Sequence, residues 1–390
     1  MGSGIFVAHR GYLEGPRGGG QVCTREYIDV LEAAGIELRL CAVDVDRRYS
    51  TRVLRKLIAT SYIRPAEPGA REAIARLAAE NPPDFVFLNQ VDLAPLAADI
   101  RRVVPSACRI VVLSHGLEST DLFHLIRLRH RLPLSGHTRP SAALALGYSL
   151  LAEQAFRRHI DAVCALSPFD VELEHWIGAA SVDWLPRIVR SAPLLWRPTG
   201  ERLGYFGTLD HAPNLEGLVA VLDCLMSKAE RGLRIRVVGS PERIGRWLEN
   251  TYPMVDYLGS LDDRNLDEEA ATWNAVLHPI FCYARGCSTK LATAIGWHVP
   301  IVTTTMGHRG YVWRGGRLVV ADEVSSYAGE CLRLLCHEDA VVAREAVIQV
   351  AQSSPALREN AARMRRLLKL EPSGREVIQD RVAVTERAGP

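Results

Sequence analysis

Short apolar segments alternate with amphipathic helical patterns along almost the whole chain, and this alternation restricts the fold more than any other feature of the sequence. A buried strand followed by a helix returns the chain to the same edge of a parallel sheet. The expected strands form two series, residues 4–8, 37–43, 84–88, 109–113 and 162–167 in the first, and 202–206, 233–238, 255–258, 275–279, 299–303 and 318–320 in the second. Helices are expected at residues 21–34 and 215–229 and from near Thr289, Ser325 and Asp339. The sequence therefore predicts an α/β protein with two parallel-sheet domains and a cleft between them.

A segment without regular alternation separates the two series. Residues 182–202 contain three prolines and no sustained period, which is typical of an interdomain connector. We therefore predict an N-terminal domain at residues 1–185, a linker at 186–202 and a C-terminal domain at 203–370. Residues 371–390 have too little apolar content to pack and are expected to form a frayed tail.

The charge balance is nearly neutral. The chain has 47 Lys+Arg and 45 Asp+Glu residues, a formal net charge of +2, which gives no overall attraction to nucleic acid, so any basic site has to be local. The nine cysteines are scattered singly without a CxxC pair, which favours a reducing compartment. We find no secretion signal, and the longest apolar stretch, residues 141–156, is interrupted by polar side chains, so we expect a cytoplasmic protein without a membrane span.

Two glycine-containing loops precede expected helices, where ligands of parallel sheets bind. The first, residues 17–20, fits an ordinary turn as well as it fits a ligand site. The second contains Arg285, Gly286, Ser288 and Thr289 and ends at Lys290, one of only four lysines in the chain. A flexible glycine, hydroxyls, helix-start amides and two cations together suit a diphosphate, although a solvated helix start would give the same local pattern.

Residues 286–304 resemble the donor-binding segment of glycosyltransferase family 4, approximately G-x-x-x-K-x-x-E-A-x-x-x-G-x-P-V-V-x-T. Further matches to that family occur in the same order along the chain: Gly19 with Gly20, then residues 205–209, 213–218, 237–239, 257–259, 277–279 and 304–310. The resemblance covers nearly the whole second half of the chain and the first half loosely. Its strength lies in the order and spacing of several motifs.

The resemblance implies a GT-B fold, in which two Rossmann-like domains with parallel sheets face each other across a cleft. The N-terminal domain then holds the acceptor and the C-terminal domain holds a nucleotide-diphosphate sugar as donor substrate, with no cofactor and no metal. The transfer would retain the anomeric configuration. The acceptor would be a glycan, a lipid-linked molecule or a small molecule, and nucleic acid is not expected.

By the same resemblance, Lys290 pairs with the donor diphosphate and Gly19 and Gly20 close on it from across the cleft. His115 corresponds to a histidine near the donor sugar, and the expected catalytic residues are His115, Lys290 and Arg285. The expected donor-binding residues are Gly19, Gly20, Gly207, Thr208, Gly239, Tyr257, Leu258, Gly286, Cys287, Ser288, Thr289, Lys290 and Thr293.

The sequence departs from the family pattern at four positions. Thr293 stands where the family has a ribose-binding Glu, Arg285 and Arg309 stand at two further acidic positions, and His298 replaces a small residue before the x-Pro pair. Because threonine offers one oxygen where a carboxylate offers two, donor affinity has to come from a different set of contacts. The two arginines either serve the diphosphate or indicate a repurposed site.

Three other functions fit parts of the pattern. A catalytically silent GT-B domain that binds a nucleotide sugar or a protein would explain the lost acidic residues, and a nucleotide-sugar 2-epimerase shares the fold but relies on carboxylates in its cleft. Asp44 and Asp46 form a DxD motif, which binds metal in the GT-A architecture but is also a common turn.

A local basic segment, residues 127–139 with nearby His124, is either a contact for a lipid-linked acceptor or the membrane surface, or an exposed helix and loop. Its histidine spacing does not match a zinc site.

Overall fold

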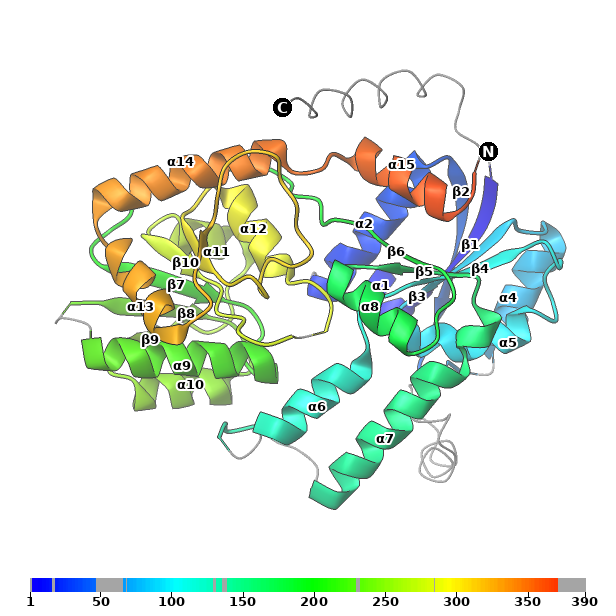
Figure 1. The fold of residues 1–390 in the computed structure, drawn as a ribbon, viewed down its shortest axis with the longest axis horizontal. Helices are drawn as coiled ribbons and strands as arrows, with labels where there is room; N and C mark the ends of the chain where they lie inside the picture. Colours follow the sequence, from blue (N-terminus) through cyan, green and yellow to red (C-terminus); the bar gives the residue numbers. More distant parts are fainter. Residues whose placement is uncertain are drawn as a thin grey trace, which may run out of the picture.

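The computed structural model describes residues 2–15, 18–46, 66–67, 69–128, 131–134, 139–228, 232–283 and 285–370. Within this part of the chain, two six-stranded sheets lie side by side, each formed from one half of the sequence (Figure 1). All strand pairs in both sheets are parallel. The predicted α/β architecture with two parallel-sheet domains is therefore confirmed.

The first sheet has the strand order β2-β1-β3-β4-β5-β6. Its strands are β1 (Gly2–His9), β2 (Ile36–Val43), β3 (Phe85–Asn89), β4 (Arg109–Leu113), β5 (Ala162–Ala165) and β6 (Val182–Trp184). Side chains on both faces of the central strands are buried, as in Val86 and Phe87, which belong to apolar clusters on opposite sides of β3, because helices cover both sides of the sheet. The near-continuous apolar runs of the sequence reflect this double burial.

The second sheet has the order β12-β11-β10-β7-β8-β9. Its strands are β7 (Arg202–Phe206), β8 (Arg234–Val238), β9 (Val255–Tyr257), β10 (Ala275–Leu277), β11 (Ile301–Thr303) and β12 (Val319–Val320). The strand Cα register brings Gly204 opposite Val276, and a Cβ atom on Gly204 would lie 1.9 Å from the ring of Trp273. The glycine at this position is what lets the buried indole pack flat on the sheet.

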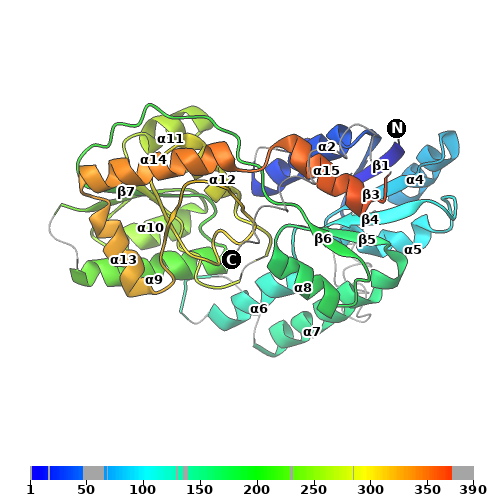
Figure 2. The same cartoon turned by 45° about the horizontal axis from the view of Figure 1, so that its top comes forward.

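Helices surround both sheets (Figures 1 and 2). Those of the first half are α1 (Arg10–Leu13), α2 (Gly19–Ala33), α4 (Gly69–Glu80), α5 (Ala97–Ile100), α6 (Glu118–Leu128), α7 (Arg139–Ala155) and α8 (Pro168–Trp176). Those of the second half are α9 (Ala212–Lys228), α10 (Glu242–Thr251), α11 (Asp263–Ala270), α12 (Thr289–Trp297), α13 (Val324–Arg333), α14 (His337–Ser353) and α15 (Leu357–Leu367). The helices expected from the sequence correspond to α2, α9, α12, α13 and α14.

The last strand of the first sheet, β6, lies inside the stretch where the sequence lost its alternation. Three residues are too few to show an alternation of apolar and polar side chains, and none of the three is fully buried. The sequence of this strand therefore shows no clear hydrophobic pattern. The connector between the sheets therefore comprises residues 185–201, and the tail at 371–390 lies outside the described residues.

Helix α15 returns to the first sheet after α14 has crossed the second. Ala361, Met364 and Leu367 of α15 are buried in the same cluster as residues of β1 and α2, and Arg365 Nη1 donates to the Ala34 carbonyl at 2.8 Å. The end of the chain thus packs on the domain that contains its beginning, whereas the sequence placed residues up to 370 with the C-terminal domain.

None of the helices in the described ranges combines the length and apolarity needed to cross a membrane.

Candidate functional site

A cavity of about 250 Å³ lies where the carboxyl ends of the two sheets face each other. Both halves of the chain line it: Tyr12, Gly19, Gly20, Cys23, Gln90, His115, Leu166, Arg187, His211, Asn214, Ile280, Arg285, Gly286, Cys287, Ser288, Thr289, Lys290 and Arg309. The predicted residues Gly19, Gly20, His115 and 285–290 are brought together here. Carboxylates are absent from this described lining, whereas four cationic side chains contribute to it.

Two helix N-termini meet across the cavity. Helix α2 begins at Gly19 and helix α12 begins at Thr289, and a Cβ atom on Gly19 would lie 3.0 Å from Thr289 Oγ1. The free amides and the positive dipole end of each helix therefore face the same space. This arrangement favours an anion with oxygens on two sides, as a diphosphate has.

Lys290 is partly buried and lines the cavity on the side of the second sheet. Its Nζ atom lies 3.1 Å from Tyr205 Oη and 4.8 Å from the centroid of the Tyr205 ring, and within the described residues it forms no ion pair with a carboxylate. Burial lowers the pKa of Lys290 to about 7. A lysine held without a counterion is prepared to gain one from an anionic ligand.

Glycine conformations leave the space that the Lys290 side chain fills. Gly207 has a φ of +121°, and a Cβ atom there would lie 2.1 Å from Lys290 Cε. Gly239, with a φ of +151°, packs against the Gly207 carbonyl, and Tyr257 Oη donates to the Gly239 carbonyl at 2.8 Å. These three predicted residues therefore lie behind Lys290 and outside the cavity lining.

Three other predicted donor-binding residues also lie outside the lining. Thr208 and Thr293 are exposed, and Thr293 Oγ1 donates back to the Thr289 carbonyl of its own helix at 3.2 Å. Leu258 packs against the apolar cluster beneath the second sheet. Their assignment to donor binding stays a prediction.

Arg285 lines the cavity, but its charge is already neutralised. Its Nη1 atom lies 3.1 Å from Glu118 Oε1 and its Nε atom 3.1 Å from Asp121 Oδ2, both on helix α6 of the first domain. Asp121 also lies 3.3 Å from His211 Nε2 of the second domain. Arg285 thus joins the two domains, and this pairing differs from the diphosphate contact expected from the sequence.

His115 is held as a neutral side chain. Its Nε2 atom lies 3.0 Å from Asn89 Oδ1, which can only accept, and its Nδ1 atom lies 3.3 Å from Gln90 Nε2, which can only donate. Burial, with Arg285 and Arg187 nearby, lowers the pKa of His115 to about 3. These partners assign the proton to Nε2, so His115 presents no charge to the cavity.

Two arginines of the lining were not among the predicted site residues. Arg309 donates to the Met306 carbonyl at 2.7 Å and to the Gly286 carbonyl, and its guanidinium lies 5.1 Å from the centroid of the Tyr283 ring, so it fixes the loop before α12. In the sequence, Arg309 stands out only as a departure from the family pattern. Arg187 lies in the connector, where no pattern distinguished it.

The candidate metal and membrane motifs lie away from the cavity. Asp44 accepts from Arg10 Nε at 3.1 Å and is absent from the lining, and the described residues contain no group of three side chains arranged to hold a metal ion. His124 is buried on α6, and Arg127 pairs with Glu216 of α9 at 2.8 Å. Residues 129–130 and 135–138 of the basic segment lie outside the described residues.

Part of the second half of the chain matches a known protein family. Residues 200–337 match the family described as glycosyl transferases group 1. No curated protein sequence matches the chain.

Solved structures resemble the fold over almost the whole chain. Sucrose-phosphate synthase from Thermosynechococcus elongatus is 14% identical, with a TM-score of 0.63 over 95% of this chain and 98% of that one. The lipopolysaccharide outer core galactosyltransferase WaaB in its apo form is 12% identical, with a TM-score of 0.61 over 95% and 100%. Anabaena HepE in complex with UDP and glucose is 12% identical, with a TM-score of 0.60 over 95% and 100%.

Proposed function

We propose that this chain, a GT-B glycosyltransferase whose residues 200–337 match glycosyl transferases group 1, transfers a sugar from a nucleotide-diphosphate sugar to an acceptor held mainly by the first domain. The observation that carries the proposal is the meeting of the α2 and α12 N-termini beside the partly buried Lys290. An anionic group with several oxygens fits between them, and a diphosphate is such a group.

In this proposal, the reaction depends on stabilising the leaving diphosphate. When the bond between the sugar C1 and the diphosphate oxygen breaks, negative charge grows on the diphosphate, and Lys290 with the helix amides is positioned to balance it. These groups take the place of a metal ion. The new bond joins C1 to the acceptor oxygen, whose proton passes to the diphosphate oxygen that has just been released.

We propose retention of the anomeric configuration. The described cavity lining offers no carboxylate that could act as a nucleophile or as a base on the opposite face of the sugar. Attack from the face that the diphosphate leaves needs neither group. His115, neutral and fixed through both ring nitrogens by Asn89 and Gln90, would contact the donor sugar as an uncharged ring.

The proposal also includes the class of donor, the location of the protein and a contact for the acceptor. HepE is described with UDP and glucose, so UDP-sugars are the first donors to test. All nine cysteines are unpaired, which supports a cytoplasmic location, and the basic segment at residues 127–139 remains a proposed contact for a lipid-linked acceptor.

Thermal shift against UDP-, GDP- and ADP-sugars, with and without EDTA, tests the proposal. A ligand present at 100 times its dissociation constant adds about 2.7 kcal/mol to the free energy of unfolding. We expect a shift with one donor class that EDTA does not change. The shift should be lost in Lys290→Ala and kept in Lys228→Ala, since Lys228 lies on the exposed end of α9, donates to the Ser325 carbonyl and does not line the cavity.

Stereochemistry is read separately, by NMR of the anomeric proton in the product. An inverted product would contradict retention, and the absence of any shift with every donor would contradict nucleotide-sugar binding.

A further inference from the structure

Arg187 is a fully buried cation in the wall of the cavity. It follows Pro186 in the connector, and only 1% of its surface is exposed. Its backbone N–H donates to the Gly310 carbonyl of the second domain at 2.9 Å, while its side chain reaches helix α2 of the first domain. Arg187 is therefore fixed at the junction of the two domains, beside the first turn of α2.

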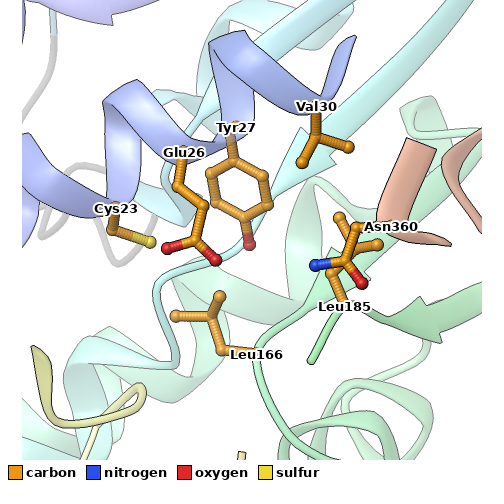
Figure 3. A pocket seen from close by; sticks show the side chains of 7 residues that line it. All are labelled: Cys23, Glu26, Tyr27, Val30, Leu166, Leu185 and Asn360. Atoms are coloured by element: carbon orange, nitrogen blue, oxygen red, sulfur yellow. The ribbon is translucent and has the colours of Figure 1, made fainter. Parts of the chain in front are cut away.

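The charge of Arg187 has one carboxylate partner among the described residues. Its Nη2 atom lies 2.7 Å from Glu26 Oε2, and the other Glu26 oxygen accepts the Ile188 N–H at 3.0 Å. Figure 3 shows the Glu26 side chain extending from α2 between Cys23 and Tyr27 toward Leu166, in a small pocket of about 10 Å³. The Glu26 carboxylate thus contacts both the Arg187 guanidinium and the backbone N–H of Ile188.

The remaining donors of Arg187 have no nitrogen or oxygen partner among the described residues. Nε and Nη1 are both buried, and the guanidinium's hydrogen bond besides its ion pair with Glu26 is to the Cys23 thiol, a weak acceptor. A buried donor without a partner is unfavourable, and a guanidinium offers five N–H groups in a plane that matches phosphate oxygens. Unlike Arg285, which two carboxylates of α6 neutralise, Arg187 has donors available to a ligand.

The groups around Arg187 favour an anionic ligand. Cys23, Cys287 and His115 all line the same cavity. Burial raises the pKa of the two thiols and lowers that of His115, and the positive charge of the guanidinium acts to lower the pKa of all three. Gly19 and Gly20 lie one turn before Cys23 on α2, so the helix amides and the guanidinium border the same end of the cavity.

We propose that Arg187 binds the donor diphosphate from the side of the first domain, opposite Lys290. This inference rests on the proposed function, because it assigns a further residue to the same site. It replaces the role that the sequence had given to Arg285. The ligand class is a nucleoside diphosphate or a nucleotide-diphosphate sugar.

Calorimetric titration of the full chain with UDP, GDP, ADP, inorganic pyrophosphate and the matching nucleosides tests the proposal. The variant is Arg187→Gln combined with Glu26→Gln, which removes both charges so that neither is left buried alone. We expect affinity for the nucleoside diphosphate and for pyrophosphate to fall about tenfold or more, as for a lost charged hydrogen bond, with nucleoside affinity unchanged within twofold.

The matched control is Arg190→Gln combined with Asp29→Asn. This pair also joins the connector to α2, but Arg190 is 68% exposed and does not line the cavity, so its loss should leave all affinities within twofold of the wild type. Should the Arg187 double variant not fold, Arg187→Lys carries the test, since it keeps the charge and loses the planar donors. A lower pyrophosphate affinity is expected there too.

Two results would overturn the inference. Unchanged pyrophosphate affinity in the Arg187 variants would show that the residue does not contact the diphosphate, and equal losses for nucleoside and nucleoside diphosphate would show a purely structural ion pair. Wild-type protein that binds no nucleotide at all would overturn the proposed function together with this inference.

Discussion

At the scale of single residues, the partly buried Lys290 makes ligand binding depend on pH. Burial lowers its pKa to about 7, so in the free protein the amine is protonated below that pH and neutral above it. A bound diphosphate favours the ammonium form and raises this pKa, so binding takes up a proton. Nucleoside diphosphate affinity should therefore fall as pH rises from 7.5 to 9, by at most about tenfold per pH unit.

Calorimetry in two buffers of different ionisation enthalpy measures the proton uptake. Above pH 7.5 the phosphates are already ionised, since their second pKa is about 6, so the uptake reports the protein. Lys290→Arg, which stays charged, should bind without uptake. Affinity that rises with pH, or uptake that persists in Lys290→Arg, would contradict the assignment.

A second residue-scale prediction concerns Gly207, whose missing side chain leaves room for Lys290. In Gly207→Ala, the new Cβ atom would lie 2.1 Å from Lys290 Cε, and the positive φ adds strain. We expect nucleoside diphosphate affinity to fall about tenfold or more because the ammonium is displaced. Gly147→Ala is the control, since nothing lies within 4 Å of a Cβ atom there. Equal affinities for both variants, measured by titration, would disprove the packing argument.

Residues differ in how much of their role the sequence could predict. Lys290, Gly19 and Gly20 come together as expected, because helix starts after parallel strands meet at one edge of each sheet. The ion pairs of Arg285 could not be predicted from its neighbours in sequence, because its partners Glu118 and Asp121 lie more than 160 positions earlier. Arg187 gave no signal, since its burial depends on how two domains pack.

At the scale of elements, helix α15 links the end of the chain to the stability of the first domain. Met364 is fully buried there, so Met364→Ala should lower the free energy of unfolding by about 2–5 kcal/mol. Urea unfolding measures the loss, and faster amide exchange in α2 should locate it. Leu357→Ala, at an exposed position of the same helix, is the control and should cost less than about 1 kcal/mol. Unaltered exchange in α2 would speak against the packing.

Elements with several turns or several alternating residues were predictable, and short ones were not. The strand β4 has the bounds expected from the sequence, because its apolar run is bounded by polar turns. The strand β6 has three residues with partly exposed side chains, so only pairing with β5 identifies it. His298 marks the end of α12 with a left-handed φ of 58°, which explains why a small residue suits that position.

At the scale of the whole molecule, ion pairs from α6 join the two domains. Burial raises the pKa of Asp121, but His211 and Arg285 outweigh this effect and hold the pKa below its usual value. The carboxylate therefore stays charged at neutral pH, and its contribution is lost only as pH falls below the ordinary range of an aspartic acid. The domain contact should be stable across physiological pH.

Removing these carboxylates should loosen the domains. We expect Glu118→Gln combined with Asp121→Asn to weaken domain closure about tenfold, because Arg285 loses both partners. Small-angle scattering should show a larger radius of gyration than in the wild type. Glu268→Gln, which breaks an exposed pair within α11, should leave it unchanged. Identical scattering from all three proteins would show that α6 does not hold the closed arrangement.

The chain passes between the domains twice, once through residues 185–201 and once between α14 and α15. Both passages lie on the side of α2 and α15, away from α6 (Figures 1 and 2). Two covalent tethers along one edge oppose sliding and twisting, whereas among the described residues the opposite edge is held by noncovalent contacts of α6, which can separate. We therefore expect donor and product to enter and leave past α6, and the exchange of ligand to be limited by how often those side chains part.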